Sequence, residues 1–199
     1  DYIDEPFADS SAINVYILSQ ETRRYATVAL SGDGADELLG GYNKHVAFLR
    51  SLHPGLKEKL IATLLPLLKL LPQSRNNSIA NGIRQAVKFG EGMRLSPADR
   101  YWQWASLASE NEASVLLDKK SQGLLSNELY AERVSEILKP LPGHSAINDM
   151  LLTDMQLVLP NDMLTKVDLM SMANSLEVRS PFLDFELVNF CFSLPSDFK

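Results

Sequence analysis

Residues 26–42 limit the possible folds of this chain more strongly than any other part of its sequence. They begin with a short apolar run of strand-forming residues, continue into the loop Ser31-Gly32-Asp33-Gly34, and enter an acidic helical turn. A strand that ends in a glycine-rich loop at the start of a helix is an architecture that commonly holds phosphate groups. The two glycines have no Cβ, so we expect the backbone of this loop to approach a ligand closely.

The acidic residues of the same stretch limit which ligand it can hold. Asp33, Asp36 and Glu37 place three carboxylates within five residues, and these would repel a bare phosphate group. Mg²⁺ prefers one or two carboxylates together with phosphate oxygens and water, so a metal ion between the acids and a phosphate is one interpretation. The alternative is a purely structural helix start, whose acids interact favourably with the helix dipole.

The composition is that of a globular protein and argues against several classes of function. The chain has 199 residues, of which 45% are hydrophobic and 22% charged, and a net charge of −6. The lysines and arginines form no basic stripe, so we expect no nucleic-acid partner. The longest apolar stretch, 60–71, is too short to span a membrane, so we expect no membrane association. The single cysteine, Cys191, excludes an internal disulfide, predicts a buried thiol and favours the cytoplasm.

The hydrophobic pattern predicts a mainly helical chain with one strand. The strand is expected at 26–30, after a helix at 12–24 with a broad buried face and with Asp9 or Ser10 as its cap. No second strand is convincing, so we expect its partner strands to lie outside this chain. Residues 73–82 resemble a linker. Further helices, separated mainly by prolines and glycines, are predicted at 44–52, 55–71 with a break near Pro66, 78–89, 97–108, 111–117, 127–138 and 146–159.

A second informative region, 159–184, lies near the C-terminus. Asn161 or Asp162 is expected to cap a helix that runs to about 174, and Pro181 to begin a last helix. Lys166 and Asp168 lie in the first of these helices. Glu177 and Arg179 alternate in an extended segment, so both charges are expected on the same side. A polar network that holds helices together explains these charges as well as a ligand site does.

Four motifs, in this order, resemble the synthetase domain of glutamine-hydrolysing asparagine synthetases. They are residues 4–13, 31–42, 159–168 and 176–184. The resemblance implies that the chain is a predominantly α-helical fragment of an α/β adenine-nucleotide-binding domain, of the ATP pyrophosphatase or HUP-like type, with one parallel-type strand. Residues 1–199 would be part of one asparagine synthase domain, with a strand, loop and helix of the nucleotide site in 1–42, a helical elaboration in 43–145, and the helical C-terminal part of the site in 146–199.

The resemblance also implies a reaction. The side-chain carboxylate of aspartate attacks the α-phosphate of Mg-ATP, which gives an acyl-adenylate and pyrophosphate, and ammonia released from glutamine by a separate N-terminal domain then displaces AMP. A carboxylate is a poor acyl donor until it is adenylated. The attack brings two anions together, so metal ions and oriented donors must offset their repulsion. ATP and Mg²⁺ are therefore the expected cofactors, and aspartate and ammonia the other substrates.

The same resemblance assigns roles to individual residues. Ser31, Gly32 and Gly34 would bind the nucleotide and the acyl-adenylate. Asp36 would be a catalytic ligand of Mg²⁺ and pyrophosphate, and Asp33 a catalytic group that positions the acceptor or takes a proton from ammonia. The residues expected only to shape the site are Glu37, Lys166, Asp168, Glu177 and Arg179. The glycine-rich loop would then form a second wall of the nucleotide site, opposite the loop that holds the phosphates.

Other parts of such a site are expected outside this chain. The Ser-Gly-Gly-x-Asp-Ser phosphate loop and the glutaminase nucleophile are not found in the sequence, and a further lysine is expected beyond residue 199. We therefore expect the rest of its own polypeptide as a partner, no asparagine formation by the isolated chain, and self-association through exposed apolar surface, for example as a homodimer. The alternatives are an amidotransferase or lactam synthetase with a different acceptor carboxylate, and a non-catalytic helical interaction module.

Overall fold

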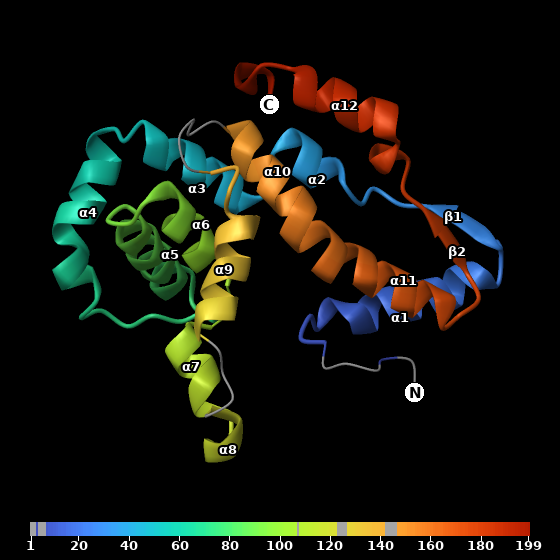
Figure 1. Cartoon of the computed structure of the whole chain (residues 1–199), viewed down its shortest axis with the longest axis horizontal. Coiled ribbons are helices and arrows are strands. Elements are labelled where there is room, and N and C mark those ends of the chain that lie inside the picture. The colour runs from blue at the N-terminus through green and yellow to red at the C-terminus, as the bar shows by residue number, and fades with distance from the viewer. Residues whose placement is uncertain (1–2, 4–6, 107, 123–126, 142–146) are drawn as a thin grey trace. The chain divides into compact units, whose positions relative to one another are not determined.

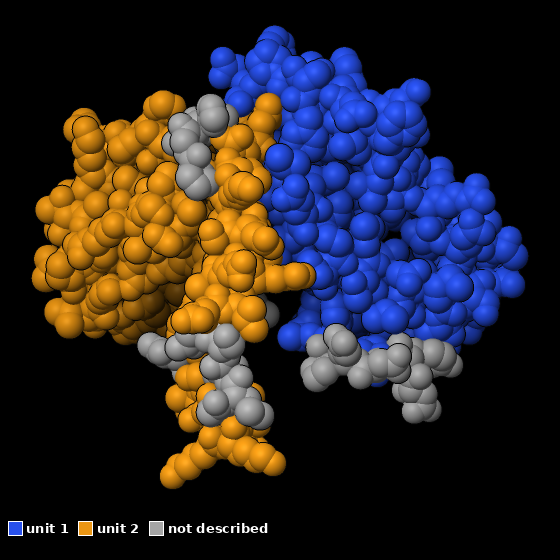
Figure 2. All heavy atoms as spheres, viewed as in Figure 1, with its two compact units in different colours: residues 1–42, 151–199 blue, residues 43–150 orange. Residues whose placement is uncertain are grey.

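The computed structural model describes residues 3, 7–106, 108–122, 127–141 and 147–199 (Figure 1). They form two compact units, coloured separately in Figure 2: unit 1 comprises residues 1–42 and 151–199, and unit 2 comprises residues 43–150. Residues 4–6 of the first motif and residues 107 and 146 of two predicted helices lie outside the described residues. None of the helices in the described ranges is long and apolar enough to cross a membrane.

The chain is mainly helical, as its sequence predicts. Unit 2 contains α3 (Asn43–Leu52), α4 (Leu56–Leu68), α5 (Ser78–Gly92), α6 (Pro97–Ala105), α7 (Glu110–Val115), α8 (Lys119–Gln122) and α9 (Asn127–Ile137). The boundary between the units falls within α10 (Ile147–Val158). Unit 1 contains α1 (Ser11–Arg23), β1 (Val28–Leu30), α2 (Ala35–Leu39), the π-helix η1 (Leu159–Leu164), α11 (Thr165–Met172), β2 (Glu177–Arg179), the 3-10 turn η2 (Pro181–Leu183), α12 (Phe185–Ser193) and the 3-10 turn η3 (Ser196–Phe198).

Unit 2 is held together by helix packing around α5. This helix packs against α4 and α6, and the ring of Phe89 stacks on Trp104 with centroids 5.9 Å apart. Ser96 caps α6, because its side chain accepts a hydrogen bond from the Asp99 N–H. The predicted break near Pro66 is wrong, since α4 continues through this proline. Only the first part of the linker-like segment is non-helical, because α5 begins at Ser78.

β1 and β2 form a parallel sheet in unit 1 (Figure 1), with Val28 opposite Glu177 and Leu30 opposite Arg179. The predicted strand at 26–30 is confirmed with shorter bounds. The prediction of a single strand, with all partner strands outside this chain, is wrong because β2 pairs with β1. A strand of three residues is too short for its alternation to indicate which distant segment it pairs with. Glu177 and Arg179 are both exposed on one face, as their alternation predicts.

α1 packs against α11, and the buried residues of α1 are small. Ala12 and Ser19 are buried, whereas Ile13, Ile17 and Leu18 are 65%, 52% and 67% exposed. The predicted broad buried face of this helix is therefore wrong within unit 1. The expected exposed apolar surface is present on α1, and association through it stays a prediction. Asp9, not Ser10, caps the helix, because its Oδ1 accepts a hydrogen bond from the Ser11 N–H at 2.8 Å.

The segment between α10 and α11 remains helical, so the predicted helix start at Asn161 or Asp162 is wrong. Pro160 has no N–H and its ring disfavours a regular α-turn, and the chain widens into the π-helix η1 around it. The side chain of Asn161 donates to the Leu157 carbonyl at 2.7 Å. The Thr165 hydroxyl donates to the Pro160 carbonyl, also at 2.7 Å. These two bonds use side chains to satisfy carbonyls in the widened segment and in the last turn of α10 before it.

The last helix begins later than the sequence predicts. Pro181 starts the short turn η2, and α12 begins at Phe185. Asp184 caps α12, because its Oδ1 accepts hydrogen bonds from the N–H groups of Glu186 and Leu187. A carboxylate satisfies free N–H groups at a helix start and interacts well with the helix dipole. Cys191 is buried in α12, as predicted.

Ser175 closes the C-terminal end of α11 in a left-handed conformation, with φ 56°. A Cβ is disfavoured there, so Ser175→Gly is expected to raise the free energy of unfolding by about 0.5–1 kcal/mol. Ser193 is the last helical residue of α12. Glycine has a lower helix propensity than serine, so Ser193→Gly is expected to lower the free energy of unfolding instead. Urea denaturation of both variants measures the contrast. A Ser175→Gly protein that is less stable than the wild type would contradict this account of the turn.

Candidate functional site

The carboxyl ends of β1 and β2 bring the first and last motifs of unit 1 together. Ser31 follows β1 and Ser180 follows β2, and because the strands are parallel both residues lie at the same edge of the sheet. The Ser31 N–H donates to the Arg179 carbonyl at 2.9 Å, and the hydroxyl oxygens of Ser31 and Ser180 are 3.3 Å apart. Ligands of open parallel sheets bind beside this edge. The candidate site therefore lies at Ser31 and Ser180.

The loop after β1 is held by contacts between its own side chains. The Ser31 hydroxyl donates to Asp33 Oδ2 at 2.5 Å, and the Asp33 N–H donates to the Ser31 oxygen at 3.2 Å. Asp33 Oδ1 has no hydrogen-bond partner among the described residues. Gly32 is exposed, and a Cβ added to it would meet no atom within 4 Å. The loop thus presents an accessible backbone at Gly32 beside an oriented carboxylate.

Gly34 is buried and links this loop to the turn η2. Its φ is 93°, a left-handed conformation that side chains disfavour. A Cβ at this position would lie 2.3 Å from Leu183 Cδ2 and 3.0 Å from Leu183 Cγ. The structure therefore places Gly34 against Leu183, where its missing side chain allows close packing of the two motifs.

The two acids at the start of α2 lie in different environments. Glu37 is buried and accepts a hydrogen bond from the Tyr42 hydroxyl at 2.7 Å. Burial and the neighbouring Glu37 raise the pKa of Tyr42 well above its usual value, so this hydroxyl keeps its proton. Asp36 is exposed, and its carboxylate has no hydrogen-bond or ion-pair partner among the described residues. Asp36 is therefore available to a ligand, while Glu37 holds the local structure.

The donor set at α2 fits a magnesium ion that is shared with a phosphate ligand. In the described part of the chain, no three His, Cys, Asp or Glu side chains converge to hold a metal ion. Mg²⁺ does not need such a cage, because it is commonly bound by one or two carboxylates, phosphate oxygens and water. The exposed, unpaired carboxylate of Asp36 is a suitable protein ligand for this arrangement.

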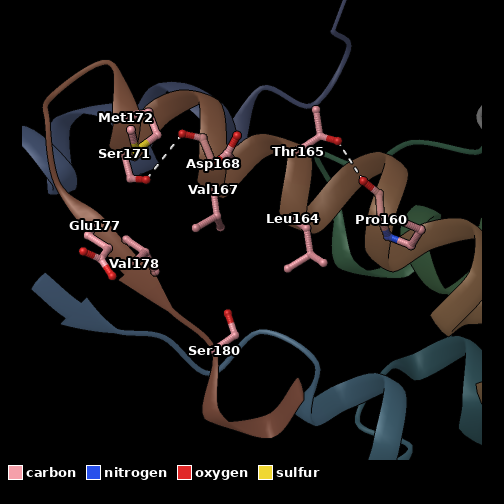
Figure 3. Close-up of a pocket in the computed structure, with 10 residues that line it drawn as sticks. All are labelled: Pro160, Leu164, Thr165, Val167, Asp168, Ser171, Met172, Glu177, Val178 and Ser180. Carbon is pink, nitrogen blue, oxygen red and sulfur yellow. Dashed lines mark hydrogen bonds between the residues drawn. The ribbon is translucent and has the colours of Figure 1, made fainter. Parts of the chain in front are cut away.

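An open pocket of about 510 Å³ lies in unit 1 between β2 and the helical segment of η1 and α11 (Figure 3). Its lining combines apolar side chains with hydroxyls and two carboxylates: Pro160, Leu164, Thr165, Val167, Asp168, Ser171, Met172, Glu177, Val178 and Ser180. Figure 3 shows Leu164 and Val167 pointing from the helical segment toward the side where β2 lies. Asp168 and Glu177, both singled out from the sequence, thus line one pocket. Ser180 does not stand out in the sequence, since its only signal is its place directly after a strand.

Glu177 and Arg179 form an exposed ion pair on β2. Arg179 Nε donates to Glu177 Oε1 at 2.7 Å, and the side chains are 66% and 54% exposed. Exposed pairs of this kind contribute at most about 1 kcal/mol. The pair is therefore easily separated when either side chain meets a ligand.

Lys166 is not among the residues that line the pocket, and it forms a largely buried ion pair. Its Nζ donates to Asp9 Oδ2 at 2.6 Å, and the side chains of Lys166 and Asp9 are 9% and 26% exposed. The Asp9 carboxylate also accepts bonds from the Ser11 N–H and hydroxyl. The pair joins the segment before α1 to α11, one wall of the pocket. Asp9 lies in the first motif, but nothing in the sequence of that motif indicates that it pairs with Lys166.

The ion pair predicts a pH dependence of stability. Hydrogen bonds from Lys166 and Ser11 lower the pKa of Asp9 from 3.8 to about 2. A lowered carboxylate pKa stabilises the fold above pH 3.8, and this contribution disappears as the pH falls toward 2. Lys166→Met is expected to lower the free energy of unfolding by about 1–2 kcal/mol near pH 6, after allowance for solvent screening, and by much less near pH 2.

Urea denaturation between pH 2 and 6 measures this difference. Lys119→Met serves as the control, because Lys119 is exposed and has no ion-pair partner among the described residues. The control is expected to follow the wild type at every pH. A Lys166→Met curve that runs parallel to the wild-type curve over the whole range would contradict the assigned role of the ion pair.

Comparisons with known proteins add to this geometry. The sequence profile of the asparagine synthase family matches residues 1–199. Asparagine synthetase [glutamine-hydrolyzing] 1 of Bacillus subtilis is 34% identical over 207 residues, which cover 100% of this chain and 29% of that protein. A putative asparagine synthetase [glutamine-hydrolyzing] of Mycobacterium tuberculosis is 31% identical over 200 residues, which cover 100% and 28%. The chain thus spans less than a third of the length of these relatives. No solved structure matches it significantly.

Proposed function

Because this chain belongs to the asparagine synthase family, we propose that it forms one wall of a site where ATP activates the side-chain carboxylate of aspartate. Ammonia from glutamine then converts the acyl-adenylate to asparagine and releases AMP. The observation that carries the proposal is the junction of Ser31 and Ser180 at the carboxyl ends of β1 and β2. Unit 1 would accordingly be part of an adenine-nucleotide-binding α/β domain.

Ser31 and Gly32 are the residues of this chain that would contact the nucleotide and the acyl-adenylate. A Cβ at Gly32 would meet no other atom, so a ligand can approach its backbone closely. Ser31 is held at its N–H by the Arg179 carbonyl and at its hydroxyl by Asp33. This double restraint orients the loop before a ligand binds, which reduces the entropy lost on binding. Gly34 supports the loop through its close packing on Leu183.

Asp33 would act on the acceptor or on ammonia. Its Oδ2 accepts a hydrogen bond from the Ser31 hydroxyl at 2.5 Å, so the carboxylate is fixed in one orientation. Oδ1 has no hydrogen-bond partner among the described residues and can receive a proton from the attacking ammonia. A positioned carboxylate in this role contributes about 10²- to 10⁴-fold to a rate.

Asp36 would hold Mg²⁺ together with the pyrophosphate part of ATP. When bound, the ion neutralises charge on the phosphates as the aspartate carboxylate attacks. Asp36 fits this role because it is exposed and unpaired, whereas its neighbour Glu37 is buried and bonded to Tyr42. Glu37 would therefore shape the site without touching the ligand, through its hydrogen bond with Tyr42.

The remaining residues would shape the pocket beside β2. Asp168, Glu177 and Ser180 line it, and Lys166 fixes α11 through Asp9. We propose that the phosphate loop and the glutaminase activity come from the rest of a longer polypeptide, since the relatives are more than three times as long as this chain. On this account the isolated chain makes no asparagine. ATP-dependent biosynthesis and a buried single cysteine fit the cytoplasm.

Product analysis with a panel of carboxylates tests the proposal. The natural protein that contains this chain is incubated with ATP, Mg²⁺ and ammonia, and with L-aspartate, L-glutamate or malonate. AMP, pyrophosphate and asparagine are expected in equal amounts, with L-aspartate alone. AMP formation with another carboxylate would favour an amidotransferase or lactam synthetase, and formation of ADP would contradict adenylation altogether.

A further inference from the structure

The turn that follows α2 folds back onto Asp36. The N–H groups of Gly40 and Gly41 both donate to the Asp36 carbonyl, at 2.9 and 3.2 Å. Gly40 has φ 76° and therefore needs to be glycine for its conformation. Gly41 is not among the residues with positive φ. Its backbone conformation is thus open to other residues, so any restriction at this position comes from the space beside it.

The side chain of Asp36 fills the space beside Gly41. A Cβ on Gly41 would lie 1.8 Å from Asp36 Oδ1, 2.7 Å from Cγ and 3.3 Å from Cβ. The three nearest atoms all belong to Asp36. The carboxylate therefore occupies the space in which any other residue at position 41 would place its first side-chain atom.

We propose that Gly41 is a positioning residue, whose missing side chain lets the Asp36 carboxylate lie over the turn in its ligand-binding orientation. The proposal rests on the proposed role of Asp36 as a ligand of Mg²⁺ and pyrophosphate. It adds a second residue on which that role depends, although Gly41 has no group that touches the ligand.

The surroundings decide what moves when position 41 carries a side chain. Glu37 is buried and bonded to the Tyr42 hydroxyl at 2.7 Å, which fixes the residues on both sides of the turn. The Asp36 side chain is exposed and unpaired among the described residues, so it is the part that rotates most easily. A methyl group on Gly41 therefore displaces the carboxylate and leaves the backbone in place.

The test compares Gly41→Ala with Gly40→Ala in the natural protein that contains this chain. Gly41→Ala is expected to raise the Mg²⁺ concentration for half-maximal pyrophosphate formation about 10-fold or more, because changing a group that orients a metal ligand typically costs about 10- to 100-fold in metal affinity or activity. Its Tm is expected to stay close to that of the wild type. Gly40→Ala strains the left-handed turn, so we expect a lower Tm and an unchanged Mg²⁺ dependence, since a Cβ on Gly40 meets no atom within 4 Å.

Two outcomes overturn the inference. One is a Gly41→Ala protein with the wild-type Mg²⁺ dependence, and the other is a Gly41→Ala protein that fails to fold, because the backbone and not the carboxylate would then have absorbed the methyl group. Asp36→Ala, measured in parallel, distinguishes failure of the Gly41 inference from failure of the proposed metal role of Asp36. If Asp36→Ala keeps full activity, the metal role itself is wrong; if it is inactive and Gly41→Ala is unaffected, only the positioning role is wrong.

Discussion

Asp36→Ala is expected to lower the rate of pyrophosphate formation about 10²- to 10³-fold while the protein stays folded. Loss of one charged ligand from a phosphoryl-transfer site removes several kcal/mol of transition-state stabilisation, and each 1.4 kcal/mol corresponds to a factor of ten. The free energy of unfolding is expected to change by less than about 0.5 kcal/mol, since Asp36 is exposed and its carboxylate has no partner among the described residues. Single-turnover assays of pyrophosphate release measure the rate, and thermal unfolding measures the stability.

Asp197→Ala is a matched control for this result. Asp197 is also an exposed aspartate of unit 1, but it lies in the turn η3 near the C-terminus. Its replacement is expected to leave pyrophosphate formation unchanged. An Asp36→Ala protein as active as this control would remove the basis for placing Mg²⁺ at α2.

Gly34→Ala is expected to cause the largest loss of stability, about 2–5 kcal/mol. Two costs add at this position: the left-handed φ of 93°, and the contact of a new Cβ with Leu183 Cδ2 at 2.3 Å. The first is worth about 1–2 kcal/mol and the second about 1–3 kcal/mol. Pyrophosphate formation is expected to fall as well, because the loop Ser31-Gly32-Asp33 and the turn η2 would no longer pack together.

Urea denaturation with two further variants separates these costs. Gly34→Ala combined with Leu183→Ala removes the clash but keeps the strain, so the double variant is expected to lose less stability than the sum of the two single changes. Gly82→Ala is the control, since Gly82 lies in α5 with open space around it and gains helix propensity from the change. Strict additivity of Gly34→Ala and Leu183→Ala would show that these two residues do not meet as described.

Local features of the fold could be predicted from the sequence because neighbouring residues determine them. The strand before Ser31 and the burial of Cys191 are both confirmed. Distant pairings could not be predicted in this way. Lys166 and Asp9 are 157 residues apart, and no local pattern indicates that they meet. The pairing of β2 with β1 is hidden for the same reason.

The candidate site shows the same division. Its acids stand out in the sequence, and the structure brings Asp168 and Glu177 to one pocket. The different environments of Asp36 and Glu37 do not follow from the sequence, because both acids suit the first turn of a helix equally well. Their side chains differ because adjacent helical residues point in directions about 100° apart, and only one direction leads to the Tyr42 hydroxyl.

An isotope-transfer measurement tests most directly whether this chain belongs to an aspartate-adenylating site. The natural protein is given aspartate with ¹⁸O in its side-chain carboxylate, together with ATP, Mg²⁺ and ammonia, and the products are examined by mass spectrometry. Attack of that carboxylate on the α-phosphate leaves one of its oxygens on the phosphate, so AMP is expected to carry one ¹⁸O atom per asparagine formed. Label in inorganic phosphate, or unlabelled AMP beside newly formed asparagine, would contradict adenylation of aspartate at this site.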